Sequence, residues 1–249
     1  MPNDKGVGFV DYVLWGDDGA PLAVVEAKRT IRSAKEGKQQ AKLYADCLEK
    51  EFKRRPLIYY SNGYEHWFWD DSNYPPRAVQ GFHTKDELEL MMQRRSSRLP
   101  LSSAVINDKI VERSYQHLAI RSITESLEKK NQRRGLIVMA TGSGKTRVVI
   151  ALVDLLMRCN WIKRTLFLAD RISLVKQASR EFGKHLPDTQ VVNLLKDHDA
   201  NGRVYVSTYQ TILNQINKLN NQTRKFGIGY FDLVIVDEAH RSIYSKYKG

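Results

Sequence analysis

The segment between Met139 and Thr146 constrains the fold of this chain most strongly. It reads Met139-Ala140-Thr141-Gly142-Ser143-Gly144-Lys145-Thr146, between an apolar run and a helical pattern. Gly142 and Gly144 let backbone N–H groups converge on an anion without intervening side chains, and a helix that begins at Lys145 adds its positive end. A strand, a glycine-rich turn and a helix in this order predict a phosphate-binding loop.

Helical and strand patterns alternate from Ile110 onward. Helices are predicted at residues 113–129, 145–159, 173–182 and 210–218, and strands at residues 135–139, 165–169, 191–194, 204–207 and 233–236. Continuous apolar strands that alternate with helices are typical of a parallel, doubly wound sheet buried on both faces. The fold class predicted for this part is therefore α/β.

A pair of acids follows the last apolar run. Asp237-Glu238-Ala239-His240 comes directly after the strand predicted at 233–236. In phosphate-loop ATPases, one such carboxylate holds Mg²⁺ and the next orients the attacking water, while the loop lysine and hydroxyl reach the β/γ-phosphates and the metal. We expect ATP and Mg²⁺ as cofactors, Glu238 as the catalytic group, and Thr146 and Asp237 at the metal. The other expected nucleotide contacts are Thr141, Gly142, Ser143, Gly144, Lys145 and His240.

The first hundred residues predict a smaller α/β domain. Strands are expected at 9–15, 22–27, 57–60 and 65–69, with a strong turn signal at 16–21 and another at Asn62-Gly63. A helix is expected at 33–52, with Leu43, Cys47 and Leu48 on its buried face. Residues 71–108 lose periodicity except for a helical turn at 85–92. The expected organisation is a first domain at 1–100, a linker at 101–109 and a second domain at 110–249.

Three charged residues in the first domain have the spacing of a metal-dependent nuclease. Asp11 and Glu26 belong to two strands of the predicted hairpin, and Lys28 lies two residues beyond Glu26 on the same face. Hydrolysis of a phosphodiester with Mg²⁺ needs carboxylates that converge on one metal and a further group beside the attacked phosphate. A charged hairpin rim would give the same pattern. Gln40 and Tyr44 lie one helical turn apart in the following helix.

The charge and composition of the chain limit the kinds of partner that it is expected to bind. The net charge is +12, and it arises almost entirely in residues 106–249, which hold 24 Lys and Arg against 13 Asp and Glu. A basic surface suits a polyanion, because phosphate contacts release counterions, although a solvated lysine-rich surface explains the charge equally well. No apolar run is long enough to cross a membrane, and the two cysteines form no disulfide framework. We therefore expect a cytoplasmic protein with no membrane partner.

The order of these motifs resembles the superfamily 2 DEAH-box helicases and translocases. Three further segments agree: Arg113-Ser114-Tyr115-Gln116 is similar to the adenine-reading segment, and residues 167–177 and 206–210 are similar to DNA-contacting motifs. The resemblance implies that Gln116 reads adenine. It implies DNA contacts at Arg171, Gln177, Thr208 and Gln210.

Residues 9–44 resemble the PD-(D/E)xK nuclease domain in the motor subunit of type I restriction enzymes. With the helicase motifs, the resemblance spans nearly the whole chain. It implies that Asp11 and Glu26 bind metal, that Lys28 is catalytic and that Gln40 and Tyr44 support cleavage. The expected fold is a small PD-(D/E)xK-type nuclease domain followed by a RecA-like phosphate-loop sheet, and the expected partners are double-stranded DNA and the modification and specificity subunits.

Two alternatives stay open beside an ATP-dependent DNA translocase and endonuclease. The first is a helicase with an inactive N-terminal domain, which acts on DNA or RNA without cutting. The second is a fragment that binds nucleotide and DNA without turnover, because the family's motor carries a second RecA-like lobe with an arginine finger. For the 249 residues alone we expect weak nucleotide binding and negligible DNA-stimulated hydrolysis.

Overall fold

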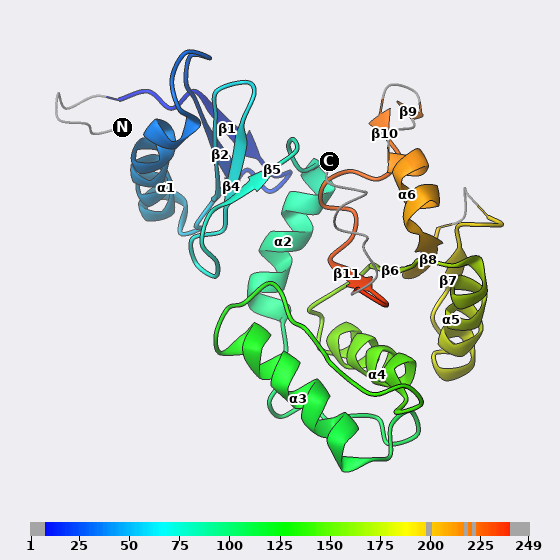
Figure 1. Ribbon diagram of the computed structural model, residues 1–249. Coiled ribbons are helices and arrows are strands. Elements are labelled where there is room, and N and C mark those ends of the chain that lie inside the picture. The colour runs from blue at the N-terminus through cyan, green and yellow to red at the C-terminus, as the bar shows by residue number, and fades with distance from the viewer. Residues whose placement is uncertain (1–7, 198–200, 217–218, 221–222, 240–249) are drawn as a thin grey trace. The chain divides into compact units, whose positions relative to one another are not determined.

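A computed structural model describes residues 8–197, 201–216, 219–220 and 223–239 of the chain. The chain divides into two compact units, residues 1–96 and residues 97–249 (Figure 1). No helix within the described ranges is long and apolar enough to cross a membrane.

The first unit is built on a mixed sheet. Its elements are β1 (Tyr12–Trp15), β2 (Pro21–Ala27), η1 (Ala34–Gly37), α1 (Lys38–Phe52), β3 (Leu57–Ser61), β4 (His66–Trp69), β5 (Arg77–Val79) and α2 (Lys85–Ser97). Within residues 8–97 the strands form one sheet in the order β1-β2-β3-β4-β5. The central pair β2 and β3 is parallel, and the other neighbours are antiparallel.

The predicted turns fix the register of this sheet. Between β1 and β2, the N–H of Gly16 donates to the carbonyl of Ala20 at 2.9 Å, and Gly19 adopts a left-handed φ of 72°. A residue without a Cβ takes this conformation at little cost. Between β3 and β4, the side-chain oxygen of Asn62 accepts from the N–H groups of residues 64 and 65. Both turns lie where the sequence predicts them.

Helix α1 covers one face of the sheet through small side chains. Ala41 and Ala45 are fully buried against Ile58 and Tyr60 of β3. Leu43, in contrast, is 47% exposed, so the predicted apolar face is wrong at this position. The buried residues of α1 are Ala41, Tyr44, Ala45 and Leu48, which recur at helical spacing, and Leu43 falls outside that face.

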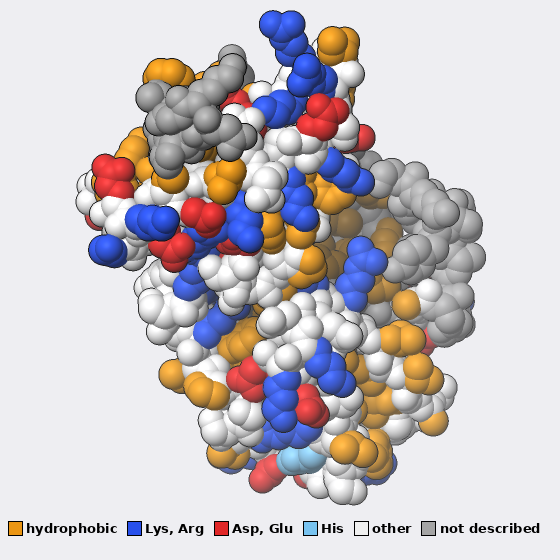
Figure 2. Space-filling view, turned by 90° about the vertical axis from the view of Figure 1, so that its left-hand side faces the viewer, with side chains coloured by type: hydrophobic (Ala, Val, Ile, Leu, Met, Phe, Trp, Pro, Cys, Tyr) orange, Lys and Arg blue, Asp and Glu red, His pale blue; other side chains and the backbone are white. Residues whose placement is uncertain are grey.

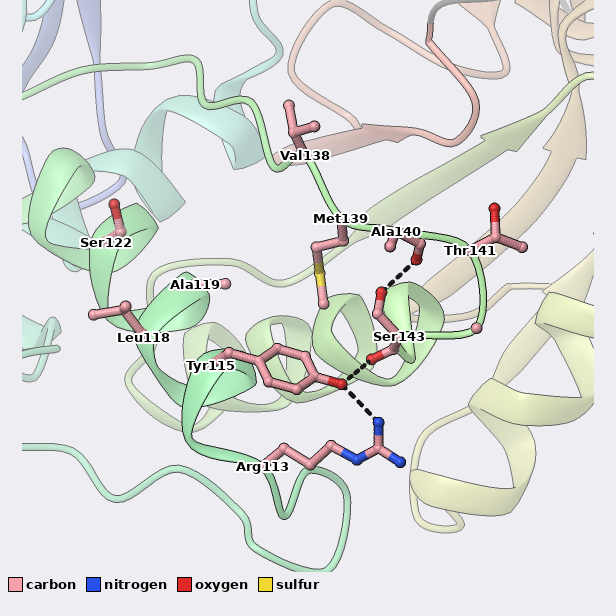
Figure 3. A pocket seen from close by; sticks show the side chains of 11 residues that line it. Arg113, Tyr115, Leu118, Ala119, Ser122, Val138, Met139, Ala140, Thr141 and Ser143 are labelled. Carbon is pink, nitrogen blue, oxygen red and sulfur yellow. Dashed lines mark hydrogen bonds between the residues drawn. The ribbon is translucent and has the colours of Figure 1, made fainter.

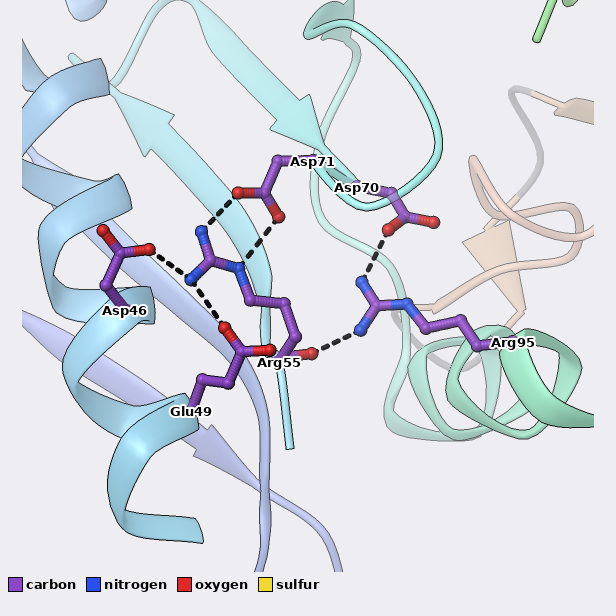
Figure 4. Close-up of polar contacts among 6 residues, drawn as sticks. All are labelled: Asp46, Glu49, Arg55, Asp70, Asp71 and Arg95. Atoms are coloured by element: carbon purple, nitrogen blue, oxygen red, sulfur yellow. Dashed lines mark hydrogen bonds and ion pairs between the residues drawn. The ribbon is translucent and has the colours of Figure 1, made fainter. Parts of the chain in front are cut away.

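Arg55 ties α1 to the end of β4 (Figure 4). Its guanidinium donates to both carboxylate oxygens of Asp71, and also to Asp46 and Glu49 of α1. The Arg55 and Asp71 side chains are 11% and 6% exposed. Arg95 of α2 binds Asp70 at 2.6 Å and the backbone carbonyl of Arg55. Charged groups so little exposed need such partners, because an unpaired buried charge is costly.

The second unit contains a parallel sheet. Its elements are α3 (Ser114–Glu128), α4 (Lys145–Arg158), β6 (Thr165–Ala169), α5 (Ile172–His185), β7 (Val191–Asn193), β8 (Val204–Thr208), α6 (Tyr209–Ile216), β9 (Leu219–Asn220), β10 (Thr223–Arg224) and β11 (Leu233–Val236). The described residues place four strands in the order β11-β6-β8-β7, all parallel. Strands β9 and β10 form a separate antiparallel pair.

Helices cover both faces of the parallel sheet. Phe167 of β6 and Val206 of β8 point into the core that α3, α4 and α5 share. The alternate residues Leu166 and Tyr205 pack on the other face, where Ile212 of α6 lies. The period of two in these strands thus fills two cores at once. The predicted α/β fold class, a small α/β unit followed by a doubly wound parallel sheet, is confirmed.

The strand expected before the phosphate loop is not formed. Residues 135–139 are irregular, and Leu136 and Val138 are 78% and 86% exposed, so that prediction is wrong. A short apolar run forms a strand only beside a strand that pairs with it, and no described strand pairs with this segment. Strand β11 pairs with β6 on one side only, at the edge of the described sheet, and its Val234 and Val236 are exposed.

The structure near the expected domain boundary also differs from what the sequence predicts. Helix α2 extends to Ser97, beyond the turn expected at 85–92, and β5 lies in the stretch expected to be irregular. Leu101 and Ile106, in the segment expected to be a linker, are buried in the core of the second unit. Apolar side chains of a connecting segment can thus join the core of one unit.

Candidate functional sites

Glu26 is the centre of the site in the first unit. It lies near the end of β2 and is only 2% exposed. Its Oε1 accepts from the Lys28 ammonium at 2.7 Å, whereas its Oε2 is buried and has no hydrogen-bond partner among the described residues. A Cβ added at Gly37 would lie 3.0 Å from the Cγ of Glu26, so η1 packs directly on this carboxylate. A buried carboxylate oxygen with an open lone pair is a ready ligand for a hard cation.

Asp11 lies beside Glu26 but not in the predicted strand. Strand β1 begins at Tyr12, and Phe9 is 84% exposed, so the expected strand at 9–15 starts three residues later. The Oδ2 of Asp11 accepts from the N–H of Ala27 at 2.7 Å, which holds the carboxylate next to the strand that carries Glu26. The structure therefore brings the two acids together through the backbone. Among the described residues, no group of three or more His, Cys, Asp or Glu side chains is arranged so that it could hold a metal ion.

Lys28, Gln40 and Tyr44 form one hydrogen-bonded chain that leads away from Glu26. The Lys28 ammonium donates to the Gln40 side-chain carbonyl at 2.7 Å, and the Gln40 amide donates to the Tyr44 hydroxyl at 2.8 Å. Gln40 and Tyr44 meet because residues four apart face the same side of α1. All the residues that the nuclease pattern singles out are thus neighbours in the structure.

The environment of Glu26 makes its negatively charged form less favourable than in water. Burial raises the pKa of Glu26, the hydrogen bond from Lys28 lowers it, and the nearby charge of Asp11 raises it again, with a net upward shift. Two carboxylates that share a site behave in this way unless a cation lies between them. Burial and the neighbouring Asp11 charge thus both favour the neutral form of Glu26, whereas Lys28 favours its charged form.

The second site forms where α4 begins and β11 ends. The Lys145 ammonium lies 3.7 Å from the Oε1 of Glu238. The N–H of Asp237 donates to the carbonyl of Leu168 at 2.9 Å, which continues the pairing of β11 with β6. Glu238 has a left-handed φ of 53°, a conformation that costs energy in a residue with a side chain. The sequence motifs, far apart in the chain, thus meet at one edge of the sheet.

Asp237 and Thr146 also belong to this second site. Burial raises the pKa of Asp237, a hydrogen bond from the Glu238 N–H lowers it, and the charges of Glu238 and Lys145 act in opposite directions, with a net upward shift. Thr146 follows Lys145 in the first turn of α4. His240 lies outside the described residues.

A cavity of about 640 Å³ lies between α3 and the phosphate loop (Figure 3). Arg113, Tyr115, Leu118 and residues 138–143 contribute to its lining. The Tyr115 hydroxyl donates to the carbonyl of Ser143 at 2.9 Å and accepts from Arg113 at 2.9 Å. Sequence reasoning did not single out Tyr115 or Arg113 as separate contacts, although both stand in the segment that resembles an adenine reader.

Gln116 braces the loop from the side of α3. Its amide nitrogen donates to the carbonyl of Ser143 at 3.0 Å, and its oxygen accepts from the N–H groups of Glu112 and Arg113. It is 4% exposed, and a Cβ on Gly144 would lie 2.6 Å from its amide nitrogen. In this structure its hydrogen-bonding groups hold the phosphate loop and the start of α3.

The residues expected to contact DNA lie at one edge of the parallel sheet. Arg171 follows β6 and Gln177 lies in α5, and both are exposed. Thr208 ends β8 opposite Ala169, and Gln210 follows it at the exposed start of α6. Among the described residues that Figure 2 shows, Lys and Arg side chains are interspersed with Asp and Glu side chains.

Comparisons with known proteins assign both parts of the chain. Residues 109–249 match the family described as "Type III restriction enzyme, res subunit", and residues 4–77 match "Type I restriction enzyme R protein N terminus". The EcoKI and EcoAI type I restriction enzyme endonuclease subunits of Escherichia coli are 26% and 27% identical over 94% and 95% of this chain. The chain spans only 24% and 30% of the length of those two relatives.

A solved fragment assigned to the HsdR subunit of a type I restriction enzyme from Vibrio vulnificus YJ016 is 28% identical. The match covers 96% of this chain and 43% of that one, with a TM-score of 0.41, too low to support a structural argument. The family assignment therefore depends on the sequence matches, which cover more than half of the chain with one family and most of the remainder with the other. The chain belongs to the restriction-enzyme res-subunit family, and its two matched parts together identify it with the endonuclease subunits of type I restriction enzymes.

Proposed function

We propose that the first unit is a Mg²⁺-dependent DNA nuclease. The observation that carries this proposal is the set of contacts around Glu26: one oxygen on Lys28, the other buried without a partner, and Asp11 held beside it. Asp11 and Glu26 would hold the metal. When bound, Mg²⁺ would lower the pKa of a water and polarise the phosphodiester.

The protein's own residues would orient the substrate and the water. Lys28 can place its ammonium beside the scissile phosphate, because it reaches out from the Glu26 carboxylate with a side chain that is 20% exposed. Gln40 holds Lys28 in place, and Tyr44 in turn holds Gln40. We expect loss of Lys28 to reduce cleavage more than loss of Tyr44, because Tyr44 acts only through its neighbours.

Cleavage of DNA by variants of the 249-residue chain tests this function. Wild type should nick plasmid DNA with Mg²⁺ or Mn²⁺ and not with EDTA. Glu26→Gln and Lys28→Met should abolish nicking, while Lys50→Ala, an exposed change on α1 away from the site, should leave it unchanged. Nicking by Glu26→Gln at the wild-type rate would show that the nuclease assignment is wrong.

We further propose that the second unit contributes one side of an ATP site in a DNA translocase. Lys145 and Glu238 support the proposal, since their side chains lie within ion-pair distance just after β11 ends. The cavity beside Tyr115 has a volume suited to a nucleobase and sugar. Double-stranded DNA and the modification and specificity subunits are the partners proposed for the whole enzyme.

A second candidate for this unit is nucleotide binding without turnover. The irregular backbone of residues 135–139 favours it, because the phosphate loop then lacks a strand to hold it in place. Binding of a fluorescent ATP analogue and DNA-stimulated phosphate release separate the two candidates. Binding that is lost in Lys145→Ala, without phosphate release, supports the second candidate; rapid phosphate release by the isolated chain excludes it.

A further inference from the structure

A row of side chains crosses the sheet from Glu26 to β4. The register aligns Glu26 of β2 with Tyr60 of β3, and Tyr60 with Trp67 of β4. Tyr60 and Trp67 are stacked with ring centroids 5.9 Å apart. Neighbouring strands are about 4.8 Å apart, so Trp67 lies roughly 10 Å from Glu26. Trp69, two residues along β4, faces the same side of the sheet.

Three lysines lie over these two indoles. The ammonium of Lys35 in η1 is 4.9 Å from the ring centroid of Trp67. The ammonium groups of Lys38 and Lys42 in α1 are 4.9 Å and 5.8 Å from that of Trp69. None of the three forms an ion pair with a carboxylate of a described residue, and both tryptophans are only partly buried. We call these five residues the lysine–tryptophan strip.

We propose that the lysine–tryptophan strip binds a single strand of DNA next to the nuclease site. The inference rests on the proposed nuclease function, and it names the form of DNA that the site holds. The lysine ammonium groups would move from the indoles to the phosphates, and unpaired bases would stack on Trp67 and Trp69.

The chemistry of the strip favours single-stranded over double-stranded DNA. A cation over a partly exposed ring is weakly bound, so the lysines can leave the indoles at little cost. Stacking of a base on an aromatic ring and contact of a cation with a phosphate are both stronger. Only an unpaired base can offer a free face to an indole, because neighbouring bases cover each other in a duplex.

Binding of a fluorescein-labelled oligothymidine to the 249-residue chain in EDTA tests the proposal. Trp67→Leu should weaken binding by at least about tenfold, the effect of losing one stacked base, and Trp67→Phe should recover most of that loss. Trp15→Leu, on the same face of the sheet but on β1, is the matched control and should leave affinity unchanged. Circular dichroism of each variant checks that it is folded.

The salt dependence of the affinity distinguishes phosphate contacts made by the lysines of the strip from attraction by the overall positive charge of the chain. Lys35→Ala/Lys38→Ala should lower the slope of log affinity against log salt by about 1.4, at 0.7 for each phosphate contact to a single strand. Lys50→Ala/Lys53→Asn removes the same charge from exposed positions and should leave the slope unchanged. An equal effect of the two pairs would overturn the proposal, because it would show that general charge and not the strip binds the strand.

Two further measurements complete the test. Duplex DNA of the same length should lose little affinity in Trp67→Leu, and a loss as large as that for the single strand would overturn the preference. Glu26→Gln should abolish cleavage and still bind the oligonucleotide. If Glu26→Gln cleaves normally while the strip variants lose binding, the proposed nuclease function is wrong and single-strand binding by the strip is supported. If the strip variants bind normally, only the proposal for the strip is wrong.

Discussion

Replacing Arg55 by Leu should destabilise the first unit by about 3 kcal/mol. The change removes a guanidinium that is 11% exposed and leaves the Asp71 carboxylate, 6% exposed, without its partner. Breaking a buried ion pair from one side costs about 3–5 kcal/mol. Asp46 and Glu49 are 41% and 50% exposed and add little, because water replaces their contacts with Arg55.

Urea unfolding followed by tryptophan fluorescence measures this loss. The chain has four tryptophans, of which Trp161 alone lies in the second unit, so a Trp161→Phe background reports on the first unit. With a slope of about 1–2 kcal/mol/M, the midpoint should fall by about 1.5–3 M urea. Glu49→Ala, which removes only the half-exposed contact, should change the free energy of unfolding by less than about 0.5 kcal/mol.

The double variant Arg55→Leu/Asp71→Leu decides between pairing and simple packing. If the cost of Arg55→Leu comes from a stranded carboxylate, removing Asp71 as well should recover at least about 1 kcal/mol relative to the sum of the two single changes. Strict additivity would refute this reasoning. So would a loss in Arg55→Leu no larger than that in Glu49→Ala.

Three further changes test other parts of the structure. The folded pKa of Glu26 is raised above its ordinary value of 4.5, so stability falls as pH rises through the interval between the two. Glu26→Gln should therefore gain stability relative to wild type as the pH rises above 4.5 in metal-free urea titrations; a constant difference would contradict this. Thr165→Val should raise the unfolding free energy by about 1 kcal/mol, because its buried hydroxyl has no hydrogen-bond partner among the described residues; a loss in thermal melts would count against it. Gly144→Ala should cost more than Gly142→Ala: both have positive φ, but only the Cβ at 144 would meet Gln116, at 2.6 Å. Equal melting temperatures for the two alanine variants would show that Gln116 yields.

The sequence predicted positions that depend on local chemistry. The turns at residues 16–21 and 62–63 lie where glycine and asparagine stand, because few other residues adopt the required backbone. The strands at 165–169 and 233–236 were predicted to the residue, since each is a continuous apolar run, although only the first is buried along its whole length. These local sequence signals can be recognised without knowing which other part of the chain packs against the segment.

Positions that depend on a partner elsewhere in the chain could not be predicted. The apolar run at 135–139 is as continuous as that of a buried strand, yet strand formation requires a neighbouring strand, and the segment itself does not encode one. Leu43 has the expected spacing for a buried helix face, but the face that packs on the sheet carries Ala41, Ala45 and Leu48 instead. In both cases the missing information is tertiary.

The two candidate sites also differ in how far apart in the chain their residues lie. The residues of the first site lie between positions 11 and 44, and one hairpin with one following helix is enough to bring them together. Lys145 and Glu238 are far apart in the chain and meet only because a helix start and a strand end share an edge of the parallel sheet. The first site needs only the first unit to keep its geometry, whereas the second depends on how firmly residues 135–139 and β11 are held. A perturbation of that edge should therefore affect nucleotide binding and leave the contacts of Glu26 intact, so the two proposed activities are separable in one chain.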